Sequence, residues 1–321
     1  MARPRIVVTR AIPEPALDEL RAAGETWVSP HDRALAAAEL HAAIRGADAV
    51  VTLLHDRVDD AFLDAAGDAL RVVANVAVGY DNVDVPACAR RGVVVTNTPG
   101  VLTEATADIA LALILMATRR LGEAERLIRT GEPWAWSMTF LLGTGLRGKT
   151  LGIVGLGQIG RATALRARAL GLEIAYTGPR RAGESVEAEL EARYLPLGEL
   201  LETADVVSLH CPLNDETRHL IDAAALAHMN PTAFLVNTTR GPVVDEGALV
   251  DALRAGAIAG AGLDVYEREP VVHPGLLELE NVVLLPHLGS ATVETRTEMA
   301  LLAARNVVAV LAGGPPLSPV A

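Results

Sequence analysis

The amino-acid sequence predicts an α/β protein with two doubly wound parallel sheets, one domain being inserted into the other. Short β-branched runs alternate with Ala- and Leu-rich helical patterns, as in parallel sheets that helices cover on both faces. The alternation is interrupted after Pro99-Gly100 and resumes at Lys149. The chain of 321 residues is also too long for one ordinary α/β core and suits two domains.

The first hundred residues contain the first alternating series. Apolar, β-branched runs predict strands at residues 5–9, 49–53, 71–75 and 93–96. Helical periodicity predicts helices at residues 15–23, 34–44, 59–66 and 84–91. After Pro99-Gly100, one long helix is expected to begin near Leu102 and to run to about Arg129.

The second series begins at Lys149. It predicts strands at residues 150–154, 173–176, 205–209, 233–237, 260–263 and 282–285, with a helix at 159–170. A last helix, from Thr292 to about Leu311, is long enough to return to the first domain. We therefore expect one domain from residues 1–100 and 289–321, with residues 101–288 inserted as the second.

Composition and charge exclude several classes of protein. Half of the residues are hydrophobic, so a large core is available. The formal net charge of −12 argues against a general nucleic-acid or membrane-surface binder, because like charges repel phosphate. The longest apolar run, residues 109–117, is too short to cross a bilayer. The sequence has only two cysteines, Cys88 and Cys211, and no apolar signal segment near the N-terminus. Both observations favour a reduced, cytoplasmic setting.

A glycine-rich turn follows the strand predicted at residues 150–154. It reads Gly155-Leu156-Gly157-Gln158-Ile159-Gly160 and precedes a predicted helix. The first glycine permits a tight turn, the second lets backbone approach a pyrophosphate, and the third allows close packing of helix and strand. The N–H groups of the helix N-terminus also favour phosphate. The turn therefore predicts a dinucleotide site, the alternative being a glycine-rich turn in an unrelated α/β protein.

The next predicted strand bears on the choice of dinucleotide. NAD sites usually place Asp or Glu about 20 residues after the glycines, to bind the ribose hydroxyls. Here the strand is followed by Thr177-Gly178-Pro179-Arg180-Arg181, which contains no carboxylate. Arg180 and Arg181 can instead pair with a 2′-phosphate through charge-assisted bonds. We therefore favour NADP(H) over NAD(H), the alternative being two arginines on a solvated loop.

Three later strand ends carry polar residues, at the edge where open α/β sheets bind ligands. Reduction of a keto acid needs a cation for the carboxylate, an acid for the developing alkoxide, and a group that keeps this acid protonated. Arg240 fits the first role and His287 the second. Glu269 fits the third, because a nearby carboxylate favours a protonated imidazole and fixes its orientation. Each alone has an ordinary alternative, as a surface arginine, a loop histidine or a solvated glutamate.

Together these residues resemble the D-isomer-specific 2-hydroxyacid dehydrogenase family over essentially the whole chain. The glycine turn, Arg240, Glu269 and His287 occur in the order and approximate spacing of that family. The resemblance implies a flavodoxin-like substrate domain at residues 1–100 and 289–321 and an NAD(P)-binding Rossmann domain at 101–288. It also implies that Arg240, Glu269 and His287 are the catalytic trio.

The resemblance implies further binding residues. In the run 76–82, backbone N–H groups near Val78 and Gly79 would hold the substrate carboxylate, the alternative being an ordinary glycine turn. The other implied substrate contacts are Leu54, Arg240 and Ser290. The implied cofactor contacts are Thr106, Gly155, Leu156, Gly157, Gln158, Ile159, Gly160, Gly178, Arg180, Arg181, Cys211, Pro212, Thr217, Thr238, Thr239, Asp264, His287 and Gly289. No metal is expected, because no His/Cys cluster has zinc spacing.

Within the family, the likeness is closest to glyoxylate/hydroxypyruvate reductases. This likeness rests on two runs of residues, Tyr176-Thr177-Gly178 and 287–292. Glu269 argues against formate dehydrogenases, which have glutamine there, and the aromatic pair that D-lactate dehydrogenases typically carry after the histidine is absent. The chain ends before the C-terminal regulatory domain of many phosphoglycerate dehydrogenases. Phe140 stands where that branch can carry a tryptophan that reaches the partner subunit, which leaves the preferred keto acid open.

The resemblance thus implies NAD(P)H-dependent reduction of glyoxylate or hydroxypyruvate to glycolate or D-glycerate, in a cleft that closes and excludes water. Two alternatives stay open: a nicotinamide-sensing, corepressor-like regulator on the same scaffold, and a D-2-hydroxyacid dehydrogenase for bulkier keto acids. The tryptophans that follow the long helix suggest a homodimer. No nucleic-acid or membrane partner is expected.

Overall fold

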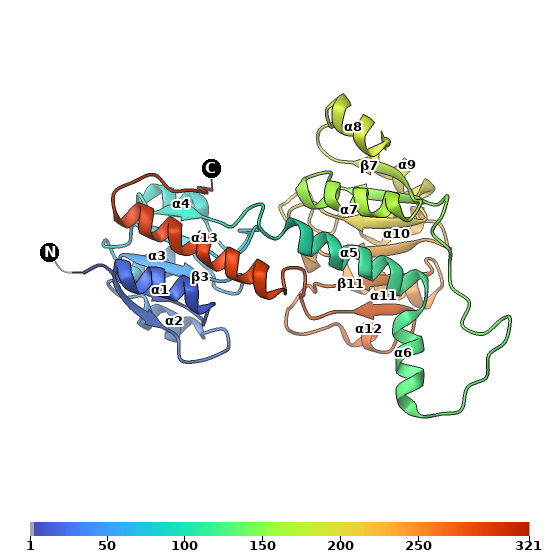
Figure 1. Cartoon of the computed structure of the whole chain (residues 1–321), viewed down its shortest axis with the longest axis horizontal. Helices are drawn as coiled ribbons and strands as arrows, with labels where there is room; N and C mark the ends of the chain where they lie inside the picture. Colours follow the sequence, from blue (N-terminus) through green and yellow to red (C-terminus); the bar gives the residue numbers. More distant parts are fainter. Residues whose placement is uncertain (1–2, 321) are drawn as a thin grey trace. The chain divides into compact units, whose positions relative to one another are not determined.

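The computed structural model describes residues 3–320, which divide into two compact units. The first unit comprises the residues up to Leu102 together with those from Ala291 onward, and the second is Thr103–Ser290. Each unit is a parallel sheet with helices on both faces (Figure 1). This is the fold class that the sequence predicts, and the prediction is confirmed.

The sheet of the first unit has five strands in the order β2-β1-β3-β4-β5. One face packs against helices α1 and α13, with Ile6 and Leu20 in the core between them. The other face packs against α2, α3 and α4, around Phe62. The elements are β1 (Arg5–Val8), α1 (Glu14–Ala23), β2 (Glu25–Val28), α2 (Ala37–Ala43), β3 (Ala49–Thr52), α3 (Asp60–Ala66), β4 (Val72–Asn75), α4 (Val85–Arg90), β5 (Val94–Thr96) and α13 (Val293–Leu311).

The last helix, α13, belongs to this unit although 188 residues of the second unit precede it (Figure 1). Thr292 caps its first turn by accepting a hydrogen bond from the N–H of Thr295. Arg71, next to β4, donates to the carbonyl oxygens of Val310 and Leu311 at the other end. Side-chain hydrogen bonds therefore hold both ends of α13.

The sheet of the second unit has seven strands in the order β12-β11-β10-β9-β6-β7-β8. Helices α5 and α7 cover one face, and α9, α10, α11 and α12 cover the other. The strands are β6 (Thr150–Val154), β7 (Glu173–Thr177), β8 (Ala192–Tyr194), β9 (Val206–Leu209), β10 (Phe234–Asn237), β11 (Gly260–Leu263) and β12 (Val282–Leu284). The helices are α5 (Thr103–Thr118), α6 (Leu121–Thr130), α7 (Gln158–Ala169), α8 (Glu184–Leu190), α9 (Leu197–Thr203), α10 (Ala223–His228), the 3₁₀ helix η1 (Gly241–Val243), α11 (Glu246–Arg254) and α12 (Pro274–Leu277).

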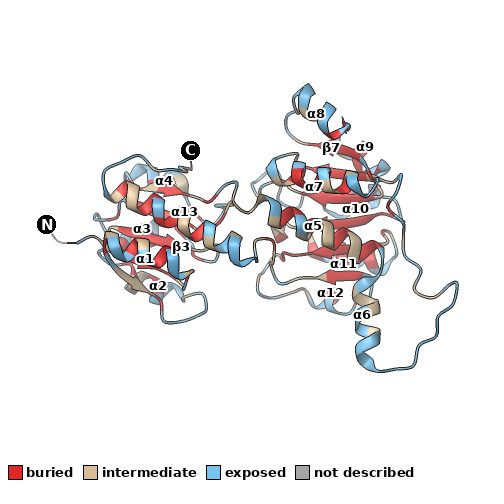
Figure 2. Cartoon of the chain, in the orientation of Figure 1, coloured by how far each residue is buried: buried red, intermediate tan, exposed pale blue. Residues whose placement is uncertain are grey.

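The single long helix expected from Leu102 to about Arg129 is wrong, because the structure has two helices there, α5 and α6. Between them Arg120 adopts a left-handed conformation with φ 54°. The carbonyl of Thr118 accepts a hydrogen bond from the N–H of Thr144 instead of continuing the helix. Seven of the 16 residues of α5 are buried, whereas α6 has no buried residue (Figure 2). The chain therefore turns where the apolar sequence ends.

Lys149 is the only lysine in the sequence and lies just before β6. Its Nζ donates to Oδ1 of Asp205 at 2.8 Å, and Oδ2 of Asp205 accepts from the N–H of Thr150 at 2.9 Å. This ion pair joins the amino ends of β6 and β9. Within residues 3–320, none of the helices combines the length and apolar character that crossing a bilayer requires.

Candidate active site

The glycine turn after β6 has the geometry that its sequence predicts. Gly155 has φ +98°, and a Cβ there would lie 2.8 Å from the backbone nitrogen of Cys211. A Cβ on Gly160 would overlap with the carbonyl oxygen of Gly155. A Cβ on Gly157, in contrast, would have no heavy atom within 4 Å. Backbone is therefore open at Gly157 and closely packed at the other two glycines.

Helix α7 begins directly after this open position. Its N-cap is Gly157, which has no side chain to bond the first N–H groups. The side-chain oxygen of Thr238, after β10, is buried and has no hydrogen-bond partner among the described residues. Burial raises the pKa of the Cys211 thiol to about 11, so the residue after β9 has a small, uncharged side chain at neutral pH. An uncapped helix end with open backbone fits a pyrophosphate, and these residues fit a dinucleotide.

The loop after β7 differs from the sequence prediction in one respect. Arg180 is exposed, as expected. Arg181 pairs with Glu187 of helix α8, its Nε and Nη2 each lying 2.8 Å from a carboxylate oxygen. The hydrogen bonds from Arg181 and Tyr176 lower the pKa of Glu187 to about 2. The sequence placed no carboxylate at this strand end, but α8 supplies one.

Glu269 and His287 form a hydrogen-bonded pair. Nδ1 of His287 lies 2.8 Å from Oε2 of Glu269, and Oε1 of Glu269 accepts from the N–H of Tyr266 at 3.1 Å. Burial alone would raise the pKa of Glu269, but the hydrogen bond and charge of His287, with the charge of Arg240, lower it. Glu269 is therefore a carboxylate at neutral pH, and within residues 3–320 no hydrogen bond involves Nε2 of His287.

Arg240 lies after β10, in a turn that Asn237 fixes. The Asn237 side chain donates to the carbonyl of Arg240 at 2.9 Å and accepts from the N–H of Thr239 at 3.0 Å. The next residue, Gly241, packs so closely on the backbone of Tyr266 that a Cβ would overlap with it. This close approach brings the turn of Arg240 against the segment that leads to Glu269.

Asp264, at the end of β11, holds the backbone of the histidine loop. Its buried carboxylate accepts from the N–H groups of Leu288 at 2.6 Å and Gly289 at 2.7 Å, and its carbonyl accepts from the N–H of His287 at 2.8 Å. Burial raises the pKa of Asp264. His287 itself adopts a left-handed conformation, φ 55°. Asp264, which the resemblance placed along the cofactor, thus also positions the imidazole.

Most of the predicted cofactor residues share one edge of the second sheet. They follow the carboxyl ends of parallel strands, which lie at the same edge of a sheet. In this way they come after β6 (Gly155, Leu156, Gly157, Gln158, Ile159 and Gly160), β7 (Gly178, Arg180 and Arg181), β9 (Cys211, Pro212 and Thr217), β10 (Thr238 and Thr239), β11 (Asp264) and β12 (His287 and Gly289). Ser290, predicted as a substrate contact, also follows β12. Thr106, in α5, joins them by donating to the carbonyl of Gly289 at 3.1 Å.

Leu54, Val78 and Gly79 belong to the first unit, after β3 and β4. The carbonyl of Val78 accepts from the Asn97 side chain at 2.8 Å, and that of Gly79 accepts from the Asn75 side chain at 3.1 Å. Their N–H groups donate to no acceptor within residues 3–320. The turn is thus fixed with two unused donors, and its contact with a substrate carboxylate stays a prediction.

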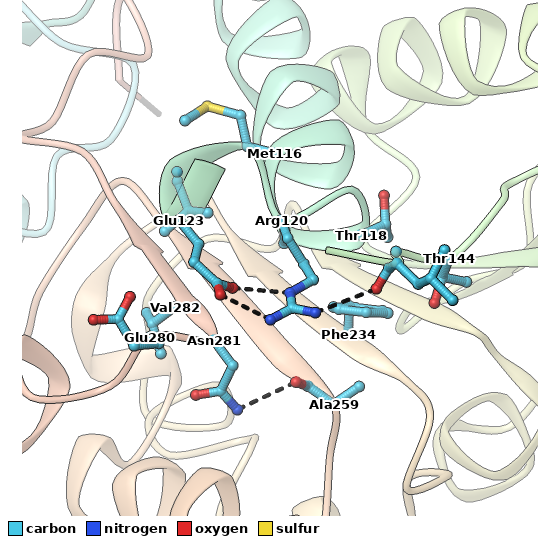
Figure 3. A pocket seen from close by; sticks show the side chains of 15 residues that line it. Met116, Thr118, Arg120, Glu123, Thr144, Phe234, Ala259, Glu280, Asn281 and Val282 are labelled. Carbon is cyan, nitrogen blue, oxygen red and sulfur yellow. Dashed lines mark hydrogen bonds and ion pairs between the residues drawn. The ribbon is translucent and has the colours of Figure 1, made fainter. Parts of the chain in front are cut away.

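A pocket of about 310 Å³ lies away from these residues, at the amino-end edge of the second sheet (Figure 3). Phe234 and Val282, the first residues of β10 and β12, line it together with Arg120 and Glu123. Both carboxylate oxygens of Glu123 pair with the guanidinium of Arg120 at 2.8 Å. No residue of the predicted catalytic trio lines this pocket.

The sequence interpretation missed three residues that organise the site. The Asn237 side chain holds the backbone of Arg240, the N–H of Tyr266 holds the carboxylate of Glu269, and Glu187 pairs with Arg181. Asn237 was detectable as a polar residue ending an apolar strand. Glu187 had no such signal, because it lies in α8, a helix that the sequence did not predict.

A glycine turn on an uncapped helix, with a His–Glu pair and an arginine at the same sheet edge, defines a dinucleotide-dependent dehydrogenase. The family model for "D-isomer specific 2-hydroxyacid dehydrogenase, NAD binding domain" matches residues 111–289. The chain is 49% identical over 312 residues to a glyoxylate reductase of Thermococcus gammatolerans, a match that covers 96% of this chain and 92% of the relative. The chain belongs to the D-isomer-specific 2-hydroxyacid dehydrogenase family, and the predicted resemblance is confirmed.

Two solved structures are similar over nearly their whole length. An NADPH-dependent glyoxylate/hydroxypyruvate reductase from Sinorhizobium meliloti, in complex with NADP and malonate, is 39% identical with a TM-score of 0.87, covering 100% of this chain and 97% of that one. The holo form of a D-mandelate dehydrogenase from Rhodotorula graminis is 31% identical with a TM-score of 0.90, covering 100% and 98%. The similarity thus extends over both units.

Proposed function

We propose that the protein reduces glyoxylate or hydroxypyruvate to glycolate or D-glycerate, with a nicotinamide dinucleotide as hydride donor. The observation that carries this proposal is the His287–Glu269 pair at the same sheet edge as the glycine turn and Arg240. The glyoxylate reductase from Thermococcus gammatolerans and the glyoxylate/hydroxypyruvate reductase from Sinorhizobium meliloti support the substrate class.

Each member of the catalytic trio has a proposed task. Arg240 binds the substrate carboxylate bidentately and polarises the carbonyl. When bound, the nicotinamide supplies the hydride. His287 donates the proton from Nε2 to the developing alkoxide, because Nδ1 is engaged by Glu269. The carboxylate of Glu269 fixes the imidazole and favours its protonated form. The free N–H groups of Val78 and Gly79 are proposed to bind the substrate carboxylate as well.

We propose NADP(H) as the favoured cofactor, with NAD(H) also accepted. The residues after β7 up to Arg181 include no carboxylate that would bind the ribose hydroxyls. Arg180 is exposed beside them, and a guanidinium suits a 2′-phosphate. The Sinorhizobium meliloti reductase, which is NADPH-dependent, supports the same choice.

Two glycines of the turn are expected to respond differently to alanine. Gly160→Ala places a methyl group against the carbonyl of Gly155, and overpacking of this kind lowers the free energy of unfolding by about 1–3 kcal/mol. Gly157→Ala meets no atom within 4 Å, so its stability should stay close to that of the wild type. Its affinity for NADPH should fall at least about tenfold, because the methyl group separates the backbone from the pyrophosphate. Urea unfolding and NADPH fluorescence titration measure these effects, and undiminished NADPH affinity in Gly157→Ala would contradict the assigned site.

We propose a homodimer formed through the arm, residues 131–149 between α6 and β6. The arm carries exposed apolar side chains, with Trp136 at 75% and Met138 at 77% exposure. Trp134 stacks on Phe140 with ring centroids 6.0 Å apart, so Phe140 packs within its own arm. Exposed aromatic clusters of this kind are typical of interfaces.

Substitution in the arm should therefore change the oligomeric state. Trp136→Glu is expected to convert a dimer into a monomer, because it places a charge in the apolar interface. The matched control is Leu277→Glu, at a 66% exposed residue of α12 outside the arm, which should stay dimeric. Light scattering after gel filtration measures both masses. A wild-type monomer would remove the proposal.

The proposed reaction is tested by following NADPH and NADH oxidation with glyoxylate, hydroxypyruvate, pyruvate and phenylpyruvate. We expect turnover with glyoxylate or hydroxypyruvate, faster with NADPH. Turnover with phenylpyruvate alone would favour a dehydrogenase for bulkier acids, for which the similar D-mandelate dehydrogenase is the supporting observation. Tight dinucleotide binding without turnover of any acid would favour the regulator instead.

A further inference from the structure

Two tyrosines fix the loop that carries Arg180 and Arg181. The hydroxyl of Tyr194 donates to the carbonyl of Gly178 at 3.2 Å, at the start of the loop. The hydroxyl of Tyr176 accepts from the N–H of Ala182 at 2.8 Å, at its end. The two rings lie 5.4 Å apart in an edge-to-face arrangement. The loop backbone is therefore held on both sides of the two arginines.

Glu187 engages the side-on donor pair of Arg181. Its side chain is only 13% exposed, and its two oxygens accept from Nε and Nη2 of Arg181 at 2.8 Å each. The hydroxyl of Tyr176 donates to the same carboxylate. Nε and Nη2 form the side-on donor pair of a guanidinium, one of the two pairs with which it can bind a phosphate bidentately. The carboxylate of Glu187 thus occupies the place that a phosphate would take on this donor pair, and it neutralises the charge of Arg181.

Arg180 is in a different situation. It is exposed, and within residues 3–320 its side chain forms no hydrogen bond or ion pair. The loop therefore presents one free guanidinium and one that a carboxylate neutralises. In dinucleotide-binding sheets the adenosine ribose lies at this strand end, and the 2′-phosphate of NADP carries a charge of about −1.5 to −2.

We propose that Glu187 weakens the preference of this enzyme for NADP(H) over NAD(H). Glu187 holds Arg181, so that Arg180 alone recognises the 2′-phosphate of NADP(H). Glu187 is a positioning residue, since it acts on the cofactor through Arg181. The inference rests on the proposed cofactor site. Its physical basis is that the carboxylate occupies the side-on donor pair of Arg181 and neutralises its charge, so that Arg181 adds little to the binding of a 2′-phosphate, a group that NAD(H) lacks.

The test compares two probes that differ only in the 2′-phosphate, adenosine 2′,5′-bisphosphate and adenosine 5′-monophosphate. Their dissociation constants are measured by calorimetry, which requires no catalytic turnover. Glu187→Gln keeps the size of the side chain and an acceptor for Tyr176 but releases the charge of Arg181. It should tighten bisphosphate binding about tenfold, as expected for one charged hydrogen-bonded pair, and leave the monophosphate unchanged.

Three further variants isolate the mechanism. Glu184→Gln removes the same charge from the exposed first turn of α8, where no ion pair is formed with a described residue, and should have little effect. Arg181→Ala should change bisphosphate affinity less than about twofold in the wild type but abolish the gain in Glu187→Gln. Arg180→Ala should reduce bisphosphate affinity to nearly that of the monophosphate. Thermal unfolding of each variant checks that the fold persists.

The outcomes separate this inference from the proposed function. The role of Glu187 would be overturned if Glu184→Gln and Glu187→Gln raised bisphosphate affinity equally. It would also be overturned if the single variant Arg181→Ala lost much of its bisphosphate affinity. Arg181→Ala retains Glu187 and Tyr176, so it decides the question even if Glu187→Gln does not fold. If neither probe nor NADH binds the wild type, the cofactor site itself is wrong. Binding of both probes with no response to Glu187→Gln removes the inference alone.

Discussion

Replacing Arg240 with alanine is expected to lower kcat/KM for glyoxylate about a thousandfold. The substitution removes both the bidentate partner of the carboxylate and a cation beside the developing alkoxide, and loss of one such electrostatic group typically costs 10²–10³-fold in rate. The fold should persist, because the turn is held through the backbone of Arg240 by the Asn237 side chain. NADPH affinity should stay close to that of the wild type. Steady-state kinetics and NADPH titration together measure the effect.

Two other variants show whether activity depends on the guanidinium group of Arg240 or only on positive charge. Arg240→Lys keeps a cation but loses the planar donor pair, so it should recover only part of the activity. Arg268→Ala removes an exposed arginine from the loop next to Glu269 and should keep nearly full activity. Wild-type kinetics in Arg240→Ala would refute the assignment of this residue. Equal losses in Arg240→Ala and Arg268→Ala would indicate a general effect of net charge.

Replacing Glu269 with glutamine is expected to change the pH dependence of the reaction. The amide keeps the shape of the side chain but removes the negative charge that faces Nδ1 of His287 at 2.8 Å. The protonated imidazole is then less favoured, so the alkaline limb of the reduction profile should move to lower pH. Activity at pH 8 should fall roughly 10- to 100-fold, and much less at pH 6. Rates over pH 5–9 measure the shift, and an unchanged profile would refute the pairing.

The same substitution has a consequence for stability with a defined sign. His287 and the charge of Arg240 hold the pKa of Glu269 below its ordinary value despite burial, which alone would raise it. A lowered carboxylate pKa stabilises the folded state above the unfolded pKa of about 4.3, and this contribution is lost as the pH falls through the lower folded value. Wild type and Glu269→Gln should therefore differ in free energy of unfolding at pH 7 and converge in acid. Urea unfolding at several pH values measures the difference, with Arg268→Ala as the control.

The sequence predicted the strands that are buried and the polar residues that end them. Val154, Asn237 and Leu263 close apolar runs, so the positions of the glycine turn, Arg240 and Asp264 followed from parallel-sheet geometry. The short strands β2 and β8 were missed, since Glu25, Arg193 and similar polar residues interrupt their apolar pattern. Both lie at sheet edges, where one neighbouring strand suffices.

Other features depend on contacts between segments distant in sequence. Thr144 ends helix α5 by bonding Thr118, and no local pattern predicts that bond. Likewise, the role of Asp264 depends on the N–H groups of Leu288 and Gly289, more than 20 residues away. Arg181 looked free because Glu187 reaches it only when α8 folds back on the loop. Local sequence therefore indicated which groups are present, and tertiary structure decided which of them remain available.

The single lysine gives this molecule a selective chemical handle. Apart from the α-amino group, an amine-reactive dye or resin has one side chain to modify, Lys149, which must first leave its ion pair with Asp205. It lies before the first residue of β6, whereas the glycine turn follows the last, about 16 Å away along a strand of five residues. A support or fluorophore attached there faces the opposite edge of the second sheet from the dinucleotide turn. Immobilised or labelled protein would thus keep that edge uncovered, without any engineered cysteine.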